Sequence, residues 1–264
     1  MRRRDFIAGL VGCAAVSLQL AVRAQQPDRV HRIGIVSGFT EEHMRPLLAA
    51  FQKRLLETGW TEGRNIIIDA RLTGGDTARL SEEAASLVAT GATVIVAQGT
   101  PGVAAVQQHS RTVPIVFTFV GDPVGLGLIE SLARPGGQVT GFTNYEYSIG
   151  GKWLELLKEI DPRLGRVAVI MNARNTGSLH YVPLIEEAGR SLSVSVSTAP
   201  VRNASEIENA IAAFAQPGSG LIVLPDSLAT SNRHLIFELA ARHRLPAVYS
   251  SSSFTTGGGL ISYG

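Results

Sequence analysis

Cysteine is almost missing from this chain of 264 residues, which contains a single one, Cys13. Without a second cysteine the chain has no internal disulfide and no cysteine metal site. The sequence also contains no Gly-x-Ser-x-Gly elbow, no His-Glu-x-x-His pair and no P-loop lysine. Its six histidines show no metal-ligand spacing, so we expect them to be surface or packing residues. We therefore expect no catalytic residues, no metal and no cofactor.

Long hydrophobic runs are also scarce, and the apolar stretch at residues 6–20 covers about 15 residues. This is short of the roughly 20 residues that a membrane-spanning helix needs. Three arginines at 2–4 precede it, and small residues follow near Ala24. This order is typical of a secretory leader, so we expect residues 1–24 to be cleaved near Ala24 and the mature chain to be periplasmic.

The export route has more than one interpretation. Arg3 and Arg4, followed by Asp5, fit the twin-arginine pattern, although paired arginines also occur in general secretory leaders. The residues before Cys13 resemble a lipoprotein cleavage box, but the apolar run continues beyond that cysteine. We expect Cys13 to be a small apolar residue and not a lipid anchor.

The mature chain lacks an excess of either charge. Without the four arginines and one aspartate of the leader, 20 basic and 21 acidic residues remain, giving a net charge of −1. A balanced charge does not favour nucleic acid or an anionic membrane surface as a partner.

What the chain does have is a regular alternation of apolar strands and helical patterns. Most of the strands are continuously apolar, which is typical of parallel strands buried on both faces. We expect strands at 32–37, 65–71, 93–97, 114–120, 139–142, 166–172, 194–201, 221–225, 246–250 and 260–263. Between them, helical spacing recurs, and Ser205 with Glu208 predicts a capping box. The fold class is therefore α/β, built from doubly wound parallel sheets.

A polar, aperiodic stretch at 134–150 suggests that the ten strands divide into two lobes with a hinge and a cleft. We place lobe 1 at 30–144 and lobe 2 at 145–252. The Ser, Thr and Gly-rich stretch before the last strand indicates a return crossing, so 253–264 is expected to rejoin lobe 1. The last strand has no helix after it, and we expect the C-terminal remainder of the fold to be absent.

Ligands of wound sheets bind beyond the carboxyl ends of the strands, so the residues that follow each strand are the candidates for binding. They are Gly38, Phe39, Thr40, Gly99, Thr100, Gly121, Asp122, Asn172, Asn175, Asp226, Ser227 and Ser251.

Chemistry suggests roles for several of these residues. Thr100 and the nearby amides at a helix start suit a carboxylate, Asp226 or Asp122 suits an amine, and Phe39 offers a stacking surface. Four of the candidates also have a structural alternative: Thr100 and Ser227 as helix caps, Asp122 as a turn residue and Phe39 as a core residue.

Several segments of the chain resemble a known family. They are 59–65 (GWTEGRN), 121–129 (GDPVGLGLI), 131–137 (SLARPGG), 239–247 (LAARHRLPA) and 258–264 (GGLISYG). Together they are similar to ABC transporter substrate-binding proteins of the tryptophan-binding-like type. The resemblance covers essentially the whole mature chain.

The resemblance implies a periplasmic, two-lobed binding protein of the type I fold that closes on a small solute and delivers it to an ABC permease. Characterised members bind aromatic amino acids, and their chains continue past the position of Gly264. Many have an Arg-Glu pair where this chain has Ser252 and Ser253, which leaves the charge of the ligand open.

We expect a monomer that binds a small organic solute, amino-acid-like or an aromatic carboxylate. Two alternatives stay open, a ligand-sensing module for a signalling receptor and an exported hydrolase.

Overall fold

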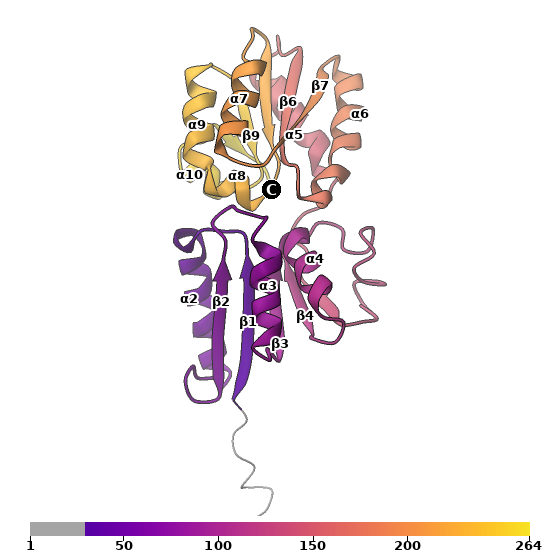
Figure 1. The fold of residues 1–264 in the computed structure, drawn as a ribbon. Coiled ribbons are helices and arrows are strands. Elements are labelled where there is room, and N and C mark those ends of the chain that lie inside the picture. The colour runs from indigo at the N-terminus through magenta and orange to yellow at the C-terminus, as the bar shows by residue number, and fades with distance from the viewer. Residues whose placement is uncertain (1–29) are drawn as a thin grey trace, which may run out of the picture.

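A computed structural model describes residues 30–264 as two α/β lobes, each built on a five-stranded parallel sheet (Figure 1). The first sheet has the strand order β2-β1-β3-β4-β5 and the second the order β10-β9-β8-β6-β7. The expected α/β fold class with two wound lobes is confirmed. The expected leader, its cleavage near Ala24 and the question of lipidation at Cys13 all lie outside the described residues.

The strands of the first sheet are β1 (His31–Ser37), β2 (Ile66–Leu72), β3 (Val94–Gln98), β4 (Ile115–Thr118) and β5 (Val139–Gly141). Its helices are α2 (Glu41–Glu57), α3 (Leu80–Ala89) and α4 (Gly99–His109). The strands of the second sheet are β6 (Arg166–Asn172), β7 (Ser195–Val201), β8 (Ser219–Val223), β9 (Ala247–Tyr249) and β10 (Ile261–Ser262). Its helical segments are α5 (Ile149–Ile160), η1 (Thr176–His180), α6 (Val182–Leu192), α7 (Ala204–Phe214), α8 (Ser227–Ser231), α9 (Arg233–Arg242) and α10 (Ser252–Thr256).

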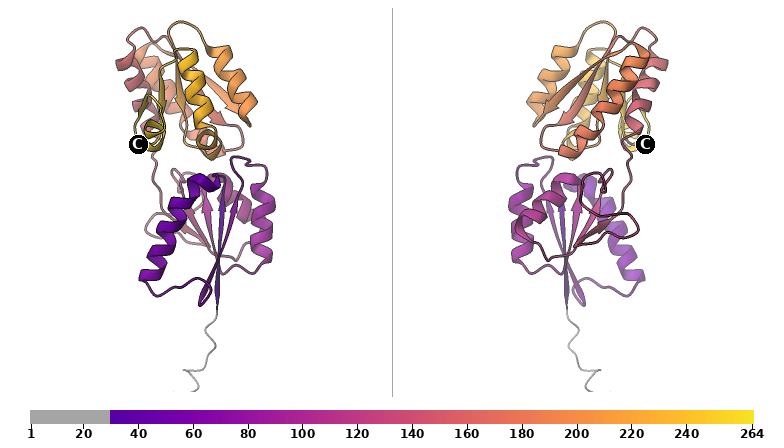
Figure 2. Two further views of the ribbon diagram at one scale, coloured as in Figure 1. Left: turned by 90° about the vertical axis from the view of Figure 1, so that its left-hand side faces the viewer. Right: turned by 90° about the vertical axis from the view of Figure 1, so that its right-hand side faces the viewer.

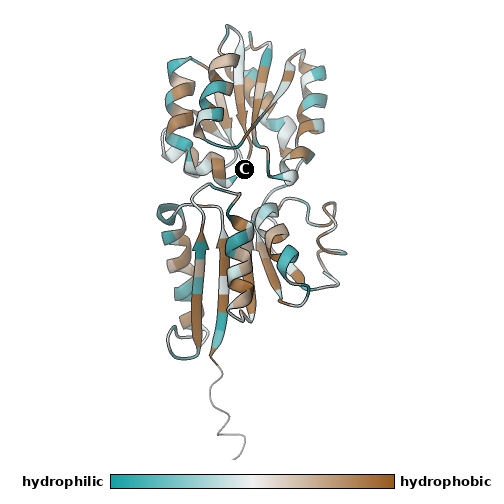
Figure 3. Cartoon of the chain, viewed as in Figure 1, coloured by the Kyte–Doolittle hydropathy of each residue, from teal (hydrophilic) through white to brown (hydrophobic). Residues whose placement is uncertain are grey.

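Continuous apolar runs become central strands because helices cover both faces of each sheet. Every residue of β8 is buried, and β6 is buried from Val167 onward. In lobe 1, α2 packs on one face of the sheet while α3 and α4 pack on the other (Figure 2). Apolar residues concentrate in the strands, whereas the helices also carry polar residues (Figure 3).

The start of α7 shows a capping box two residues before the expected one. Asn203 Oδ1 accepts a hydrogen bond from the Glu206 backbone N at 2.9 Å, and Glu206 Oε2 accepts one from the Arg202 backbone N at 3.0 Å. The prediction of Ser205 and Glu208 is therefore wrong, because the helix begins at Ala204 and its orphan N–H groups lie further upstream.

The C-terminal strand differs from the expectation of a return to lobe 1. β10 pairs in parallel with β9, with Ile261 opposite Val248, and so belongs to the second sheet. The stretch before it holds α10, whose Phe254 is 2% exposed and stacks on Tyr249 at a centroid distance of 5.1 Å. This anchor makes β9, α10 and β10 one wound unit. Within residues 30–264 the chain passes between the lobes once, at 142–148.

Among the described residues, no helix combines the length and the apolar character needed to cross a membrane.

Candidate functional site

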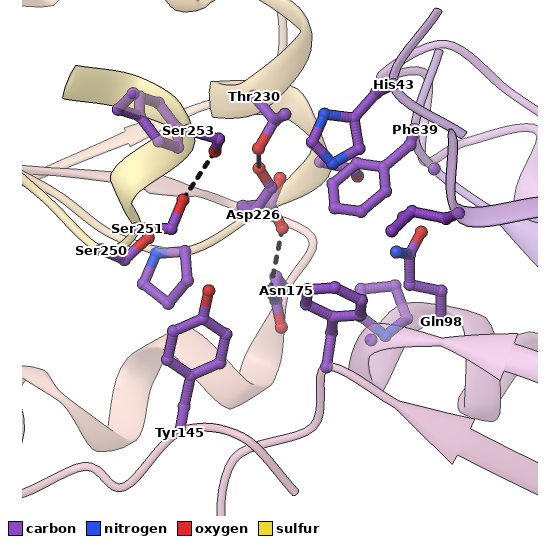
Figure 4. A pocket seen from close by; sticks show the side chains of 18 of the residues that line it. Phe39, His43, Gln98, Tyr145, Asn175, Asp226, Thr230, Ser250, Ser251 and Ser253 are labelled. Atoms are coloured by element: carbon purple, nitrogen blue, oxygen red, sulfur yellow. Dashed lines mark hydrogen bonds between the residues drawn. The ribbon is translucent and has the colours of Figure 1, made fainter. Parts of the chain in front are cut away.

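A cavity of about 300 Å³ lies between the two lobes, at the carboxyl ends of the strands (Figure 4). Both lobes and the crossover contribute to its wall, so that a bound molecule would be enclosed when the lobes are together. The lining residues are Gly38, Phe39, His43, Leu47, Leu80, Gln98, Gly99, Pro101, Phe119, Tyr145, Asn175, Pro225, Asp226, Ser227, Thr230, Ser250, Ser251, Ser252, Ser253 and Phe254.

Lobe 1 supplies an aromatic wall. Phe39 follows β1, where its backbone N donates to Ser37 Oγ at 3.0 Å, and its ring lies edge-on to that of Phe119 at a centroid distance of 5.6 Å. The His43 ring lies 4.2 Å from the Phe39 ring. Phe119 has a φ of 57°, which is uncommon for a bulky residue and persists only where the surrounding structure holds the backbone in place. These rings give the cavity an aromatic side.

The base of the cavity on the lobe 1 side is the start of α4. Gln98 is the N-cap residue, and its carboxamide oxygen accepts a hydrogen bond from the Ser37 hydroxyl. Gly99 has a φ of 69°, a conformation that glycine adopts without strain. The expected cap, Thr100, lies inside the first turn of the helix and does not cap it. Of the first residues of α4, Gly99 is the one that brings a backbone N–H to this cavity wall, because Pro101 has none and Thr100 lies outside the wall.

Lobe 2 contributes the carboxylate of Asp226. Its Oδ1 accepts hydrogen bonds from Asn172 Nδ2 at 2.8 Å and from the Leu228 backbone N at 2.7 Å, and its Oδ2 accepts one from Asn175 Nδ2 at 2.9 Å. Burial raises the pKa of Asp226, while these three hydrogen bonds act in the opposite direction. The carboxylate caps α8 and is held in a fixed orientation at the cavity.

Hydroxyl groups complete the lobe 2 wall. Ser251 Oγ and Ser253 Oγ lie 2.7 Å apart at the start of α10, and Thr230 Oγ1 donates to the Asp226 backbone oxygen at 2.9 Å. Tyr145 reaches the same region from the crossover (Figure 4). Burial raises the pKa of Tyr145, and its hydrogen bond with Ser250 opposes that shift. The cavity thus has an aromatic side in lobe 1 and a mainly polar side in lobe 2.

The two lobes touch each other around the cavity. A Cβ atom added to Gly38 would lie 2.2 Å from Ser227 Oγ, and one added to Gly177 would lie 2.6 Å from Thr100 Oγ1. The small residues at these points let the lobes approach closely, so the structure is a closed arrangement of the two lobes.

The cavity wall brings together a group of the residues expected at the site, namely Gly38, Phe39, Gly99, Asn175, Asp226, Ser227 and Ser251.

The other expected residues lie elsewhere. Thr40 caps α2 and accepts a hydrogen bond from the His43 backbone N at 3.3 Å. Thr100 and Gly121 line a separate cavity of about 20 Å³. Asp122 lies in an outer groove, where its carboxylate accepts a hydrogen bond from the Gly125 backbone N at 2.8 Å. Asn172 is 2% exposed behind Asp226 and holds it in place.

Sequence reasoning misses several residues of the wall. The apolar pattern places Phe119 in a strand, although β4 ends at Thr118. His43 is expected at the surface or in packing, but it lies in the first turn of α2 and lines the cavity. Gln98 is absent from the expected site residues, although it directly follows the expected strand at 93–97. The rule that ligands bind beyond the carboxyl ends of strands could have identified it.

Two wound α/β lobes with a cavity between them are the architecture of two-lobed, solute-binding proteins. The sequence model of the family described as "ABC transporter substrate binding protein" matches residues 32–264, and the chain belongs to this family.

Known proteins are similar over most of the chain. A "Tyrosine-binding protein" of Clostridioides difficile (strain R20291) is 29% identical over 214 residues, which is 81% of this chain and 61% of the relative. The chain thus spans less than two thirds of the length of that curated relative.

Two solved structures share the fold. A conserved domain protein from Vibrio cholerae has a TM-score of 0.79 and 24% identity, covering 89% of this chain and 78% of that one. An ABC domain in complex with L-Trp from Streptococcus pneumonia has a TM-score of 0.77 and 21% identity, covering 88% of this chain and 78% of that one.

Proposed function

We propose that the chain captures a small organic solute in the inter-lobe cavity, as the periplasmic solute-binding component of an ABC importer. The cavity itself is the observation that carries this proposal. It lies between the two lobes and is lined by aromatic rings on one side and by a fixed carboxylate on the other. Its volume of about 300 Å³ is at the lower end of the range for small-molecule sites.

The solute that best fits this wall is amino-acid-like or aromatic. An aromatic part packs against Phe39 and Phe119, and an amine binds Asp226. A carboxylate, where the solute has one, accepts from the Gly99 amide and from the hydroxyls near Ser251. Asp122 is assigned no role in binding, because it lines a different groove.

Membership of the family supports the rest of the proposal, in which the mature protein gives up the solute unchanged and delivers it to a membrane permease. We also propose that the mature protein works as a monomer. A ligand shifts the protein toward the closed state only as far as it binds that state better than the open one. Solutes that fit the closed cavity are therefore the ones that hold the lobes together.

A thermal-shift screen of the mature protein against amino acids and small aromatic acids tests the proposal. A ligand at 100 times its dissociation constant adds about 2.7 kcal/mol to the free energy of unfolding, which is a clear shift in Tm. Asp226→Ala removes the shift, whereas Asp122→Ala, a carboxylate outside the cavity, keeps it. Absence of any shift across the screen, or equal shifts in both variants, contradicts the proposed site.

A further inference from the structure

The charge that lines the cavity is negative. Among residues 30–264, the lining residues include one carboxylate, Asp226, and neither lysine nor arginine. His43 is the other titratable group that could carry a charge near neutral pH, and burial followed by the charge of Arg233 lowers its pKa, which favours the neutral ring. When Asp226 is ionised, which a bound ammonium group favours, the cavity offers that group a full negative charge and no full positive one.

Asp226 has capacity for one more partner. An ionised carboxylate accepts about four hydrogen bonds, and the carboxylate of Asp226 receives three, two on Oδ1 and one on Oδ2. All three donors are neutral groups, so they orient the carboxylate without balancing its charge. A protonated amine that contacts Oδ2 completes the set with a charge-assisted hydrogen bond.

The aromatic residues around this carboxylate favour a cation as well. Phe39, Phe119 and Tyr145 line the same cavity, and their ring faces attract ammonium groups. Figure 4 shows Phe39, Tyr145 and Asp226 around the same cavity, and aromatic rings and carboxylates are both groups that attract ammonium ions. For a ligand carboxylate the same wall provides only neutral donors, such as the Gly99 amide and the Ser251 hydroxyl.

On the basis of the proposed function, we propose that the anchoring group of the solute is its protonated amine and that a carboxylate is dispensable. The site then accepts aromatic primary amines together with aromatic amino acids, and rejects aromatic acids that lack the amine. Rejection has a physical cause, because an acid without an amine brings a second negative charge into the cavity of Asp226 and leaves the first unpaired.

Matched ligand series separate these possibilities by isothermal titration calorimetry on the mature protein. The first series is L-tyrosine, tyramine and 3-(4-hydroxyphenyl)propionate, and the second is L-tryptophan, tryptamine and indole-3-propionate. In at least one series we expect the amine to bind within about tenfold of the amino acid, and the acid to bind at least about 100-fold more weakly than the amine.

The outcomes distinguish the two proposals. If an amino acid binds but its amine is more than about 100-fold weaker, the inference is overturned while the proposed function stands. The inference is likewise overturned, and the proposed function kept, if the acid binds as well as the amine. If no compound of either series binds, the proposed ligand class fails, and the inference with it.

Variants give an independent reading. Asp226→Asn is expected to weaken amine binding by about 100-fold, whereas Asp122→Asn leaves it within about twofold of the unchanged protein. Melting curves of both variants establish that they are folded. If Asp226→Asn does not fold, the ligand series on the unchanged protein still decides the matter; equal amine binding in both folded variants overturns the inference.

Discussion

Glu42 on α2 and Arg233 on α9 form an ion pair across the boundary between the lobes, with 3.2 Å between the carboxylate Oε1 and the guanidinium Nη2. Arg233 is also held by the Thr230 backbone oxygen, to which it donates at 3.3 Å. Each lobe has its own sheet and core, so this pair depends on the lobes being together. It stabilises the closed arrangement and not the fold of either lobe.

Removal of this pair is expected to speed ligand release. Arg233→Gln should raise the dissociation rate about two- to fivefold, since partly exposed pairs contribute up to about 1 kcal/mol. Stopped-flow release of a bound ligand measures this rate. Arg242→Gln is the matched control, because its pair with Glu238, at 2.6 Å, lies within α9. Added salt should speed ligand release from the unchanged protein more than from Arg233→Gln, because salt screens the ion pair. Equal release rates in the unchanged protein, Arg233→Gln and Arg242→Gln would show that the pair does not hold the lobes together.

Gly38→Ala tests whether close approach of the lobes is required. Its new Cβ would lie 2.2 Å from Ser227 Oγ and 2.7 Å from Ser227 Cβ, so full closure is blocked. We expect ligand affinity to fall by roughly tenfold, which is about 1.4 kcal/mol, with little change in the Tm of the empty protein. Calorimetric titration and melting curves measure the two effects.

A control and a rescue sharpen this test. Gly137→Ala introduces a methyl group in the same lobe where nothing lies within 4 Å, and affinity should stay unchanged. Ser227→Gly combined with Gly38→Ala removes both clashing atoms and should recover part of the lost affinity. Failure of this rescue would place the effect of Gly38→Ala somewhere other than the lobe contact.

The strands are predictable because burial on both faces leaves a strong signal in the sequence. The run Val167 to Met171 is apolar throughout, and β6 lies where the pattern predicts it. Phe119 shows where this signal ends. The apolar run continues to Val120, but a φ of 57° at Phe119 turns the chain out of the strand and into the cavity wall, and hydrophobic periodicity does not encode such a turn.

The structure of the C-terminal segment, and the sheet that it joins, are less predictable for a related reason. The stretch 250–259 is rich in serine and glycine, and its buried anchor is one aromatic residue, Phe254. A single apolar residue creates no period, so the segment resembles a linker. In the site, Asp226 follows from its place after a strand, whereas the roles of Asn172 and Asn175 as its donors depend on contacts over more than 50 residues of chain.

Phe254→Ala should destabilise lobe 2. The side chain packs between Tyr249 and Phe237, so its loss leaves a cavity and removes the anchor of α10. The free energy of unfolding is expected to fall by about 3–5 kcal/mol, measured by urea denaturation. Phe142→Ala is the control, because Phe142 is 75% exposed and its removal should change stability by less than about 0.5 kcal/mol. Similar losses in the two variants would contradict the anchoring role.

The pKa of Asp226 predicts how the stability of the empty protein depends on pH. Burial raises this pKa above its ordinary value of 3.8, so the native state holds the proton more tightly than the unfolded state does. The contribution of Asp226 to the free energy of unfolding is therefore greatest below pH 3.8 and falls as pH rises through the raised pKa. Other carboxylates titrate in this range, so the measurement is the difference in urea stability between the unchanged protein and Asp226→Asn. As pH rises, the unchanged protein should lose stability relative to Asp226→Asn. A difference that stays constant with pH would contradict the raised pKa.

Amine binding should have the opposite dependence on pH, because an ammonium ion stabilises the ionised form of the same carboxylate. Affinity for tyramine is expected to be constant well above the pKa of Asp226 and to fall by about tenfold for each pH unit below it, since protons then compete with the amine. Tyramine is suited to this test because it has no carboxylate of its own to titrate. Titration calorimetry from about pH 4 to about pH 8 measures the profile, with Asp226→Asn expected to bind weakly and without this pH dependence. If the affinity for tyramine changes with pH in the same way in the unchanged protein and in Asp226→Asn, the amine does not pair with Asp226.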